Sequence, residues 1–283
     1  MTVLFNLLAR LPLWWVHGLG ALAGLALLLS PRSRAAIAGN LRSAGLYSMG
    51  GLLRAGVGVG RGILEMLPVW LRPVDRARAL VRACSGWAHV DAALARGRGV
   101  LLLTPHLGCS ELAAIYSAAR VPLTALYRPP RQEWVHALMK RGRDRGQLRT
   151  VPPARAGVRA LLTALKRNEA ALILPDQAAG KGEGAWTRFL GRDAYMPTLP
   201  YRLLASTGAT PLLCFCERLP RGRGYRLWIE ALDGLSDDSG VAMARVNARI
   251  EAWIRQHPDQ YLWTYRIHRR VPPGGGTTVG GPV

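Results

Sequence analysis

A histidine and a glutamate that follow a short apolar run could act together in proton transfer. His106 comes after Val100–Leu103, and Glu111 stands a short loop beyond it, at the start of the next apolar run. A neutral imidazole can accept a proton from a hydroxyl group near neutral pH, and a carboxylate bonded to its second nitrogen fixes the tautomer and stabilises the imidazolium. We therefore predict that His106 is a general base and that Glu111 is its partner.

A purely structural interpretation of these two residues is also open. His106 would then be a hydrogen-bonded loop histidine, and Glu111 a carboxylate stabilised by the N-terminus of a helix. The position of the pair favours chemistry, because Val100–Leu103 has the pattern of a strand buried on both faces. Open α/β sheets bind their ligands beyond the carboxyl ends of such strands, and Gly108 lets the loop turn back towards the strand.

Two later apolar runs also end in polar side chains. Val121–Leu126 is followed by Arg128, and Ala170–Leu174 is followed by Asp176 and Gln177. Because parallel strands deliver their carboxyl ends to one edge of a sheet, we expect these side chains to share one crevice with His106.

The order of the apolar runs predicts the fold class. Strands that alternate with helical segments are typical of an α/β protein, so we expect a mostly parallel central sheet flanked by helices. The segments that we assign in addition are strands over 211–217 and 225–232, the second at an antiparallel edge, and helices over 75–95, 132–140, 157–166 and 241–256.

The composition narrows the range of partners. Of 283 residues, 38 are Lys or Arg and 17 are Asp or Glu, so the net charge is +21 and an anionic partner is expected. Nucleic acid, anionic lipid headgroups and an acidic carrier protein all fit this charge. We expect no nucleic-acid partner, because the basic residues are spread along the chain rather than gathered on a recognisable binding module.

The N-terminal region is expected to associate with a membrane. Leu11–Leu29 carries no formal charge, and as a helix of about 1.5 Å per residue it would extend roughly 28 Å, close to the thickness of a bilayer core. Trp14 and Trp15 are typical of a membrane interface, although a buried core helix is the alternative. Whether the segment crosses the bilayer or enters one leaflet is left open. We divide the chain into membrane anchor and interfacial helices (1–70), an α/β domain (71–271) and a disordered tail (272–283).

The four cysteines do not indicate a metal site. Cys84, Cys109, Cys214 and Cys216 lack zinc-ligand spacing, and we expect them to remain thiols. Cys109 lies between His106 and Glu111, but a thiolate nucleophile would need a base of its own, so we do not assign it that role.

Several motifs, taken in order along the chain, resemble a known family. They are HLGCSE from His106, then YRPP, GRDR, LPDQ, FLG and a closing PDQYLW. Together they resemble the late acyltransferases of lipid A biosynthesis, a branch of the lysophospholipid acyltransferase-like superfamily. Where that family usually has a His-Arg-Arg triplet after the tryptophan, this chain has Thr264–Ile267.

The resemblance implies a bacterial inner-membrane enzyme whose active site faces the cytoplasm. Such enzymes transfer a fatty acyl group from acyl carrier protein, or from coenzyme A, to a hydroxyl of a lipid A precursor, and they require no metal or other cofactor. His106 would be the base and Glu111 its partner. Substrate binding would fall to Arg128, Arg143, Arg145, Asp176 and Gln177.

Two alternatives remain at this point. The acceptor could be another glycolipid or a lysophospholipid, with the same acyl-transfer chemistry. The chain could also be a non-catalytic protein that binds anionic membranes, with His106 and Glu111 in structural roles.

Overall fold

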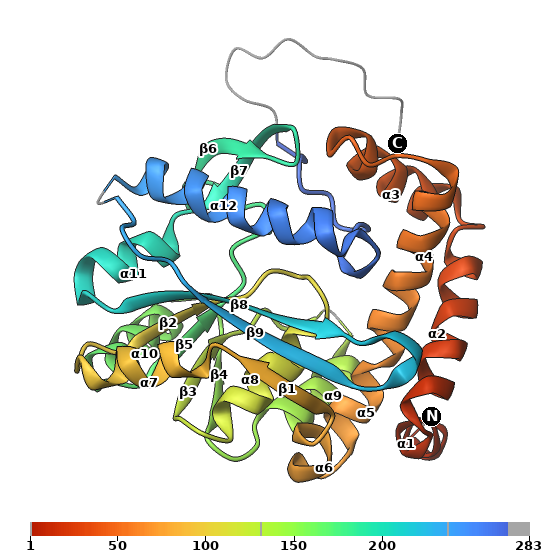
Figure 1. Ribbon diagram of the computed structural model, residues 1–283, viewed down its shortest axis with the longest axis horizontal. Coiled ribbons are helices and arrows are strands. Elements are labelled where there is room, and N and C mark those ends of the chain that lie inside the picture. Colours follow the sequence, from red (N-terminus) through yellow and green to blue (C-terminus); the bar gives the residue numbers. More distant parts are fainter. Residues whose placement is uncertain (1, 131, 237, 271–283) are drawn as a thin grey trace.

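The computed structural model describes residues 2–130, 132–236 and 238–270, so the tail predicted over 272–283 lies outside the described residues. In these residues the chain forms a seven-stranded sheet of order β1-β9-β8-β2-β5-β3-β4 and a separate hairpin, β6-β7 (Figure 1). The strands are β1 Val81–Ser85, β2 Val100–Leu103, β3 Leu123–Leu126, β4 Leu148–Val151, β5 Ala170–Ile173, β6 Gly184–Phe189, β7 Arg192–Pro197, β8 Thr210–Arg218 and β9 Tyr225–Ala231.

Helices flank the sheet. They are α1 Thr2–Arg10, α2 Leu13–Leu27, α3 Pro31–Ser43, α4 Met49–Leu64, α5 Met66–Leu71, α6 Val74–Arg78, α7 Trp87–Ala95, α8 Ser110–Ala118, α9 Glu133–Arg143, α10 Arg155–Lys166, α11 Leu199–Thr207 and α12 Ser239–Gln256. Short 3-10 turns occur at Pro220–Gly222 and Pro258–Gln260.

The strand directions confirm the predicted fold class. Strands β8, β2, β5, β3 and β4 pair in parallel, whereas β9 is antiparallel to β8. The antiparallel pairing of the last two strands was expected, but β9 is not an edge, because β1 pairs with its free side in parallel. The result is a mixed, mostly parallel sheet with helices around it.

Strand β2 is buried on both faces, as its apolar run predicted. Leu101 and Leu103 belong to one core cluster, which also contains side chains of α12, and Val100 and Leu102 belong to the other, which contains side chains of α8. Figure 1 shows α12 above the strands and α8 below them. The alternation follows from the two-residue period of a strand and holds the end of β2 firmly in place.

The prediction of one continuous helix over 75–95 is wrong. The structure divides this segment into α6, strand β1 and α7. Residues of Val81–Ser85 pair with β9 and so cover an edge that would otherwise have unpaired backbone groups. Gly86 ends the strand with a φ of +88°, and a Cβ there would collide with the carbonyl of Ile229. Strand β4 and the β6-β7 hairpin were also not predicted.

The apolar run near the N-terminus forms α2, which packs closely against α4. A Cβ on Gly20 would lie 2.7 Å from the Cα of Arg61, and a Cβ on Gly24 or Gly60 would collide with backbone of the facing helix. Among the described residues, no single helix has the length and apolar character needed to cross a membrane. Helices α2 and α3 meet that requirement only jointly, and they are bent by 98° relative to each other.

A buried charged cluster, which we call the Glu65 cluster, joins these helices to the sheet. The Glu65 carboxylate accepts hydrogen bonds of 2.7 Å from Arg218 Nε, Arg218 Nη2 and the Tyr225 hydroxyl, and His17 Nε2 lies 3.3 Å from it. Burial acts to raise the pKa of Glu65, but the charge and hydrogen bonds of Arg218, assisted by His17, lower it to about 2. The cluster therefore stays ionised and ties α2 and α4 to β8 and β9.

Candidate active site

His106 lies in the loop that follows β2, and its imidazole is held by Asp176. Nδ1 of His106 is 2.7 Å from Oδ1 of Asp176, and the backbone N–H of His106 donates a 2.8 Å hydrogen bond to Oδ2. Asp176 follows β5, the direct neighbour of β2, and is only 1% exposed. One carboxylate oxygen thus holds the imidazole and the other holds the backbone of the same residue.

The remaining imidazole nitrogen faces an uncharged amide side chain. Nε2 of His106 lies 3.0 Å from the side-chain nitrogen of Gln177, and the His106 side chain is 23% exposed. An amide N–H facing Nε2 and a carboxylate facing Nδ1 are both consistent with a neutral imidazole protonated at Nδ1. A substrate hydroxyl that replaced the Gln177 amide would meet the basic lone pair.

The loop is held in place by the closing segment of the chain. The N–H of Leu262 donates to the carbonyl of His106, and the N–H of Gly108 donates to the carbonyl of Gln260, each at 3.0 Å. Gly108 has a φ of +61°, and a Cβ at this position would collide with the carbonyl of Cys216. Only glycine fits this turn without strain. The PDQYLW motif therefore positions the histidine.

The predicted pairing of Glu111 with His106 is wrong. The Glu111 carboxylate accepts a 2.7 Å bond from Arg143 Nε, a second bond from Arg143 Nη2 and a 3.1 Å bond from Trp70 Nε1. Glu111 is in the first turn of α8, and its side chain meets α5 and α9 there. Asp176, which arrives on the adjacent strand, occupies the position beside the imidazole instead.

Arg143, the partner of Glu111, is held by this carboxylate and by the aromatic ring of Tyr127. Its guanidinium lies 4.6 Å from the centre of the Tyr127 ring, and the side chain is 16% exposed. Burial acts to lower the pKa of Arg143, but the charge and hydrogen bonds of Glu111 raise it above its ordinary value. The guanidinium is therefore a fixed cation. Its Nε and Nη2 groups bond to Glu111, and Nη1 takes no part in these two bonds.

The other two predicted arginines do not join this arrangement. Arg145 donates hydrogen bonds of 2.5 Å and 2.7 Å to the carbonyls of Arg72 and Val69. It thereby supplies donors for backbone carbonyls at the C-terminal end of α5. Burial lowers its pKa. Arg128, beyond β3, is exposed, and within the described chain its side chain makes no hydrogen bond or ion pair. The structure thus brings together His106, Asp176 and Gln177, with Glu111 paired to Arg143 on a separate element.

Three aromatic residues that contact the charged side chains were not among the predicted site residues. Tyr127 and Tyr261 stand inside the YRPP and PDQYLW motifs, which is the signal that could have identified them. Tyr261 is buried near Asp176, and burial and this carboxylate raise its pKa well above the ordinary value. Trp70 carries no such signal, because it lies in an ordinary apolar stretch.

The cysteines are packing residues. Cys109 is fully buried, and burial raises the pKa of its thiol well above the ordinary value, which opposes formation of a thiolate. All four cysteines are free. In the described part of the chain no group of His, Cys, Asp and Glu side chains could hold a metal ion.

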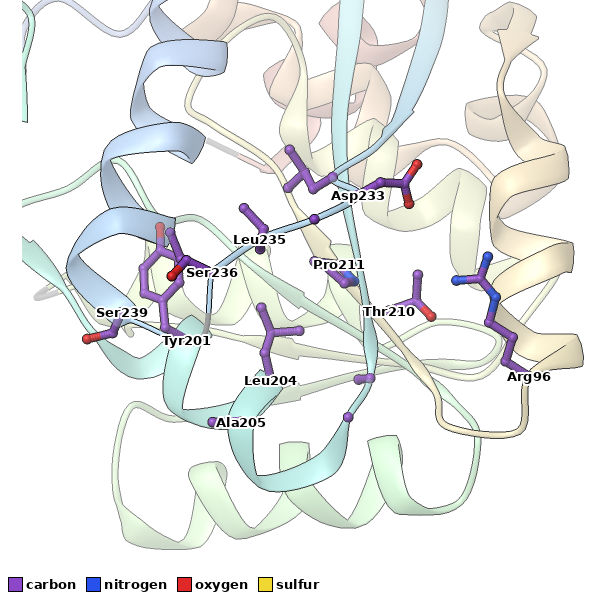
Figure 2. Close-up of a pocket in the computed structure, with 15 residues that line it drawn as sticks. Arg96, Tyr201, Leu204, Ala205, Thr210, Pro211, Asp233, Leu235, Ser236 and Ser239 are labelled. Atoms are coloured by element: carbon purple, nitrogen blue, oxygen red, sulfur yellow. The ribbon is translucent and has the colours of Figure 1, made fainter.

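A cavity of about 330 Å³ lies at the opposite end of the sheet from His106. It is lined by Thr210 and Pro211, which pair with the first residues of β2, whereas His106 follows the last. Figure 2 shows Tyr201 and Ser239 on one side of this cavity and Arg96 on the other. The cavity is therefore separate from the candidate active site.

A mixed α/β sheet with a histidine–aspartate pair at the ends of its parallel strands agrees with what comparison with known proteins finds. The family model for bacterial lipid A biosynthesis acyltransferases matches residues 57–271. The chain belongs to this family, which confirms the resemblance seen in the motifs. It is accordingly an enzyme of acyl transfer in lipid A synthesis.

Individual relatives agree with the family. The chain is similar to the lipid A biosynthesis palmitoleoyltransferase of Escherichia coli, with 29% identity over 76% of this chain and 70% of the relative. It is 28% identical to the lauroyltransferase of the same organism, over 76% of this chain and 71% of that protein. A phosphatidylinositol mannoside acyltransferase of Mycobacterium tuberculosis is 27% identical over 64% of this chain and 58% of its own length.

Proposed function

We propose that this protein transfers a fatty acyl group from an acyl thioester to a hydroxyl of a lipid A precursor, with His106 as general base. The observation that carries the proposal is the geometry at His106: Asp176 binds Nδ1 at 2.7 Å, Nε2 faces the neutral amide of Gln177, and the side chain is 23% exposed. A thioester is already activated, so the enzyme mainly has to deprotonate the attacking alcohol and stabilise the negative charge that develops.

In the proposed step, Nε2 of His106 removes the proton of the acceptor hydroxyl as the oxygen attacks the thioester carbonyl. The negative charge of Asp176 stabilises the imidazolium that forms. When the tetrahedral intermediate collapses, the carbon–sulfur bond breaks and the imidazolium returns its proton to the leaving thiolate. The products are an ester and a free thiol, and His106 is neutral again.

Arg143 is proposed to stabilise the oxyanion. The backbone N–H groups of Gly108 and Cys109, which follow the histidine, donate to the carbonyls of Gln260 and Cys216 and are therefore occupied. A side-chain donor is needed in their place, and the Nη1 group of Arg143 carries a positive charge suited to this role. Glu111 would then act as a positioning residue that fixes this guanidinium.

The donor is proposed to be acyl carrier protein, with acyl-coenzyme A as the other thioester of the same chemistry. The net charge of +21 favours an acidic carrier and a membrane rich in anionic lipid. We propose that the protein sits at the inner membrane with its active site on the cytoplasmic side. Exposed Trp14 and Trp15 on α2, and exposed Leu4 and Leu7 on α1, support attachment through the N-terminal helices.

A second acceptor class is supported by one comparison. The similarity to phosphatidylinositol mannoside acyltransferases indicates that a different glycolipid hydroxyl could be used with the same base. The product of the reaction distinguishes the two acceptors.

The test is complementation followed by mass spectrometry of the glycolipids. Cells that lack the protein should regain one acyl chain on lipid A when they express the wild-type protein, but not when they express His106→Ala. The control is His89→Ala, which removes an exposed histidine of α7. Purified His106→Ala should be folded and slower by about two to four orders of magnitude.

Near-normal transfer by His106→Ala would contradict the assignment of the base. An extra acyl chain on another glycolipid, with lipid A unchanged, would favour the second acceptor. Membrane binding without any consumption of thioester would support the non-catalytic alternative.

A further inference from the structure

A second cavity, of about 500 Å³, is lined by four arginines and no acidic residue in the described structure. The arginines are Arg10, Arg72, Arg76 and Arg82, with Pro73, Ala79 and Leu80 completing the wall. We call it the arginine cavity. It is formed where the end of α1, the segment from Arg72 through α6 and the start of β1 meet.

The positive charges in this cavity are not neutralised by neighbouring acids. No carboxylate lies within 4.0 Å of any of the four guanidinium groups in the part of the chain that the structure describes. Arg72 is fixed by bonds of 2.7 Å and 2.6 Å to the carbonyls of Ala9 and Leu11, and Arg82 Nε donates to the carbonyl of Arg223. Like charges held together in this way favour an anion, and guanidinium groups suit phosphate oxygens especially well.

The arginine cavity lies at the same sheet edge as His106. Strand β1 is parallel to β9, which is antiparallel to β8, and β8 is parallel to β2. The start of β1 therefore shares an edge with the end of β2. Helix α5 connects the cavity to the Glu111–Arg143 pair, because Trp70 near its end bonds to Glu111 and Arg72 directly after it lines the cavity.

The surroundings indicate a lipid as the carrier of the phosphate. Arg10 ends α1, whose Leu4 and Leu7 are 57% and 56% exposed, and α2 begins shortly afterwards with Trp14 and Trp15, which are 54% and 50% exposed. Apolar side chains left in solvent on the two helices that flank Arg10 in the sequence, together with an unneutralised basic cavity, match the chemistry of a lipid–water interface. A free phosphate would make no use of the apolar residues.

We propose that the arginine cavity binds the phosphate of an anionic membrane lipid, with its acyl chains lying against the exposed apolar residues of α1 and α2. Binding here concerns the attachment of the protein and does not depend on the identity of the acyl acceptor. Arg10, Arg76 and Arg82 approach the phosphate, while Arg72 is already tied to the backbone and forms the floor. The site would set the height of the His106 edge above the headgroups.

The test measures partitioning of the full chain onto phosphatidylcholine vesicles with and without phosphatidic acid. Arg76→Gln/Arg82→Gln should weaken binding to the acidic vesicles by about tenfold or more, and should leave binding to pure phosphatidylcholine unchanged. The matched control, Arg159→Gln/Arg167→Gln, removes two exposed charges on and just after α10, at the other half of the sheet. It should weaken binding by less than about twofold. Arg76→Gln alone should reproduce part of the loss, because within the described chain the Arg76 side chain makes no hydrogen bond or ion pair that the substitution would break.

Three results would overturn the proposal. Equal losses in the two double variants would mean that general charge attraction, not the cavity, binds the membrane. A loss that extends to pure phosphatidylcholine would point to the apolar contacts or to misfolding. Tight calorimetric binding of inorganic phosphate that Arg76→Gln/Arg82→Gln abolishes, with unchanged vesicle partitioning, would mean that the ligand is a free phosphate rather than a lipid.

Discussion

Two clusters in this molecule combine a histidine, a carboxylate and an arginine, and they differ mainly in their access to solvent. The first, which we call the rim cluster, contains the linked side chains of His106, Asp176 and Gln177, together with the separate Glu111–Arg143 pair that we propose to act with them. Its histidine side chain is 23% exposed. In the Glu65 cluster the corresponding histidine, His17, is 6% exposed and the glutamate is fully buried. The same types of side chain therefore occur in one accessible and one closed arrangement.

The difference shows how burial separates structure from chemistry. In the Glu65 cluster Arg218, Tyr225 and His17 all face the carboxylate, so no lone pair is presented to a ligand. In the rim cluster the acid groups are divided: Asp176 takes the imidazole and Glu111 takes the guanidinium. This division leaves Nε2 of the imidazole facing the neutral amide of Gln177.

The largest effect is expected for Asp176→Asn. The amide preserves the shape of the side chain but cannot stabilise an imidazolium, and it can favour the wrong tautomer, so acyl transfer should fall by about a thousand- to ten-thousandfold. The rate of thioester consumption by the purified protein measures this effect, with the melting temperature as a check on folding. A variant that transfers acyl groups at a near-normal rate would remove Asp176 from the account.

The next largest effect is expected in the Glu65 cluster. Glu65→Gln leaves the Arg218 guanidinium buried without a counter-charge, and should lower the free energy of unfolding by about 3–5 kcal/mol. Denaturant unfolding gives this value. The activity per folded molecule should stay close to that of the wild type. A large loss of activity at unchanged stability would mean that the Glu65 cluster takes part in the reaction.

The pH dependence of stability should report the same cluster. The pKa of Glu65 is lowered from 4.5 to about 2 in the folded protein, so its contribution is complete above pH 4.5 and is lost as the pH falls towards 2. A difference of this size corresponds to about 3 kcal/mol. Between pH 4.5 and 2 the free energy of unfolding should fall more steeply with decreasing pH for the wild type than for Glu65→Gln. Parallel curves for the two proteins would contradict the assignment.

The smallest effect is expected for Glu111→Gln. The amide keeps part of the contact with Arg143 but no longer holds the guanidinium as a paired ion, so transfer should slow by about ten- to a hundredfold through poorer positioning. The comparison with Asp176→Asn is made in the same assay. If Glu111→Gln were the slower of the two, the two carboxylates would have exchanged the roles assigned here.

Much of the rim cluster could be predicted, because local patterns indicate where strands end. The apolar runs before His106 and Asp176 identify two buried strands, and parallel strands must bring their ends to one edge. The choice of carboxylate could not be predicted in this way. It depends on β5 being the neighbour of β2, and this order is decided by packing between distant segments.

The errors in the fold have a similar origin. Val81–Ser85 was assigned to a helix because its apolar spacing fits a helix as well as a strand, and only pairing with β9 decides between them. The roles of Arg145 and Trp70 depend on how the end of α5 meets α9 and α8. Such contacts join segments far apart in the chain and leave no local signal.

The most direct test of the central claim is the tautomer of His106 in the resting enzyme, read from long-range proton–nitrogen NMR correlations. His106→Gln identifies the signals by their loss. We predict a neutral imidazole that is protonated at Nδ1, towards Asp176, with an unprotonated Nε2 that faces the acceptor hydroxyl. A resting imidazole protonated at Nε2 would place its basic nitrogen against Asp176 and would contradict the account.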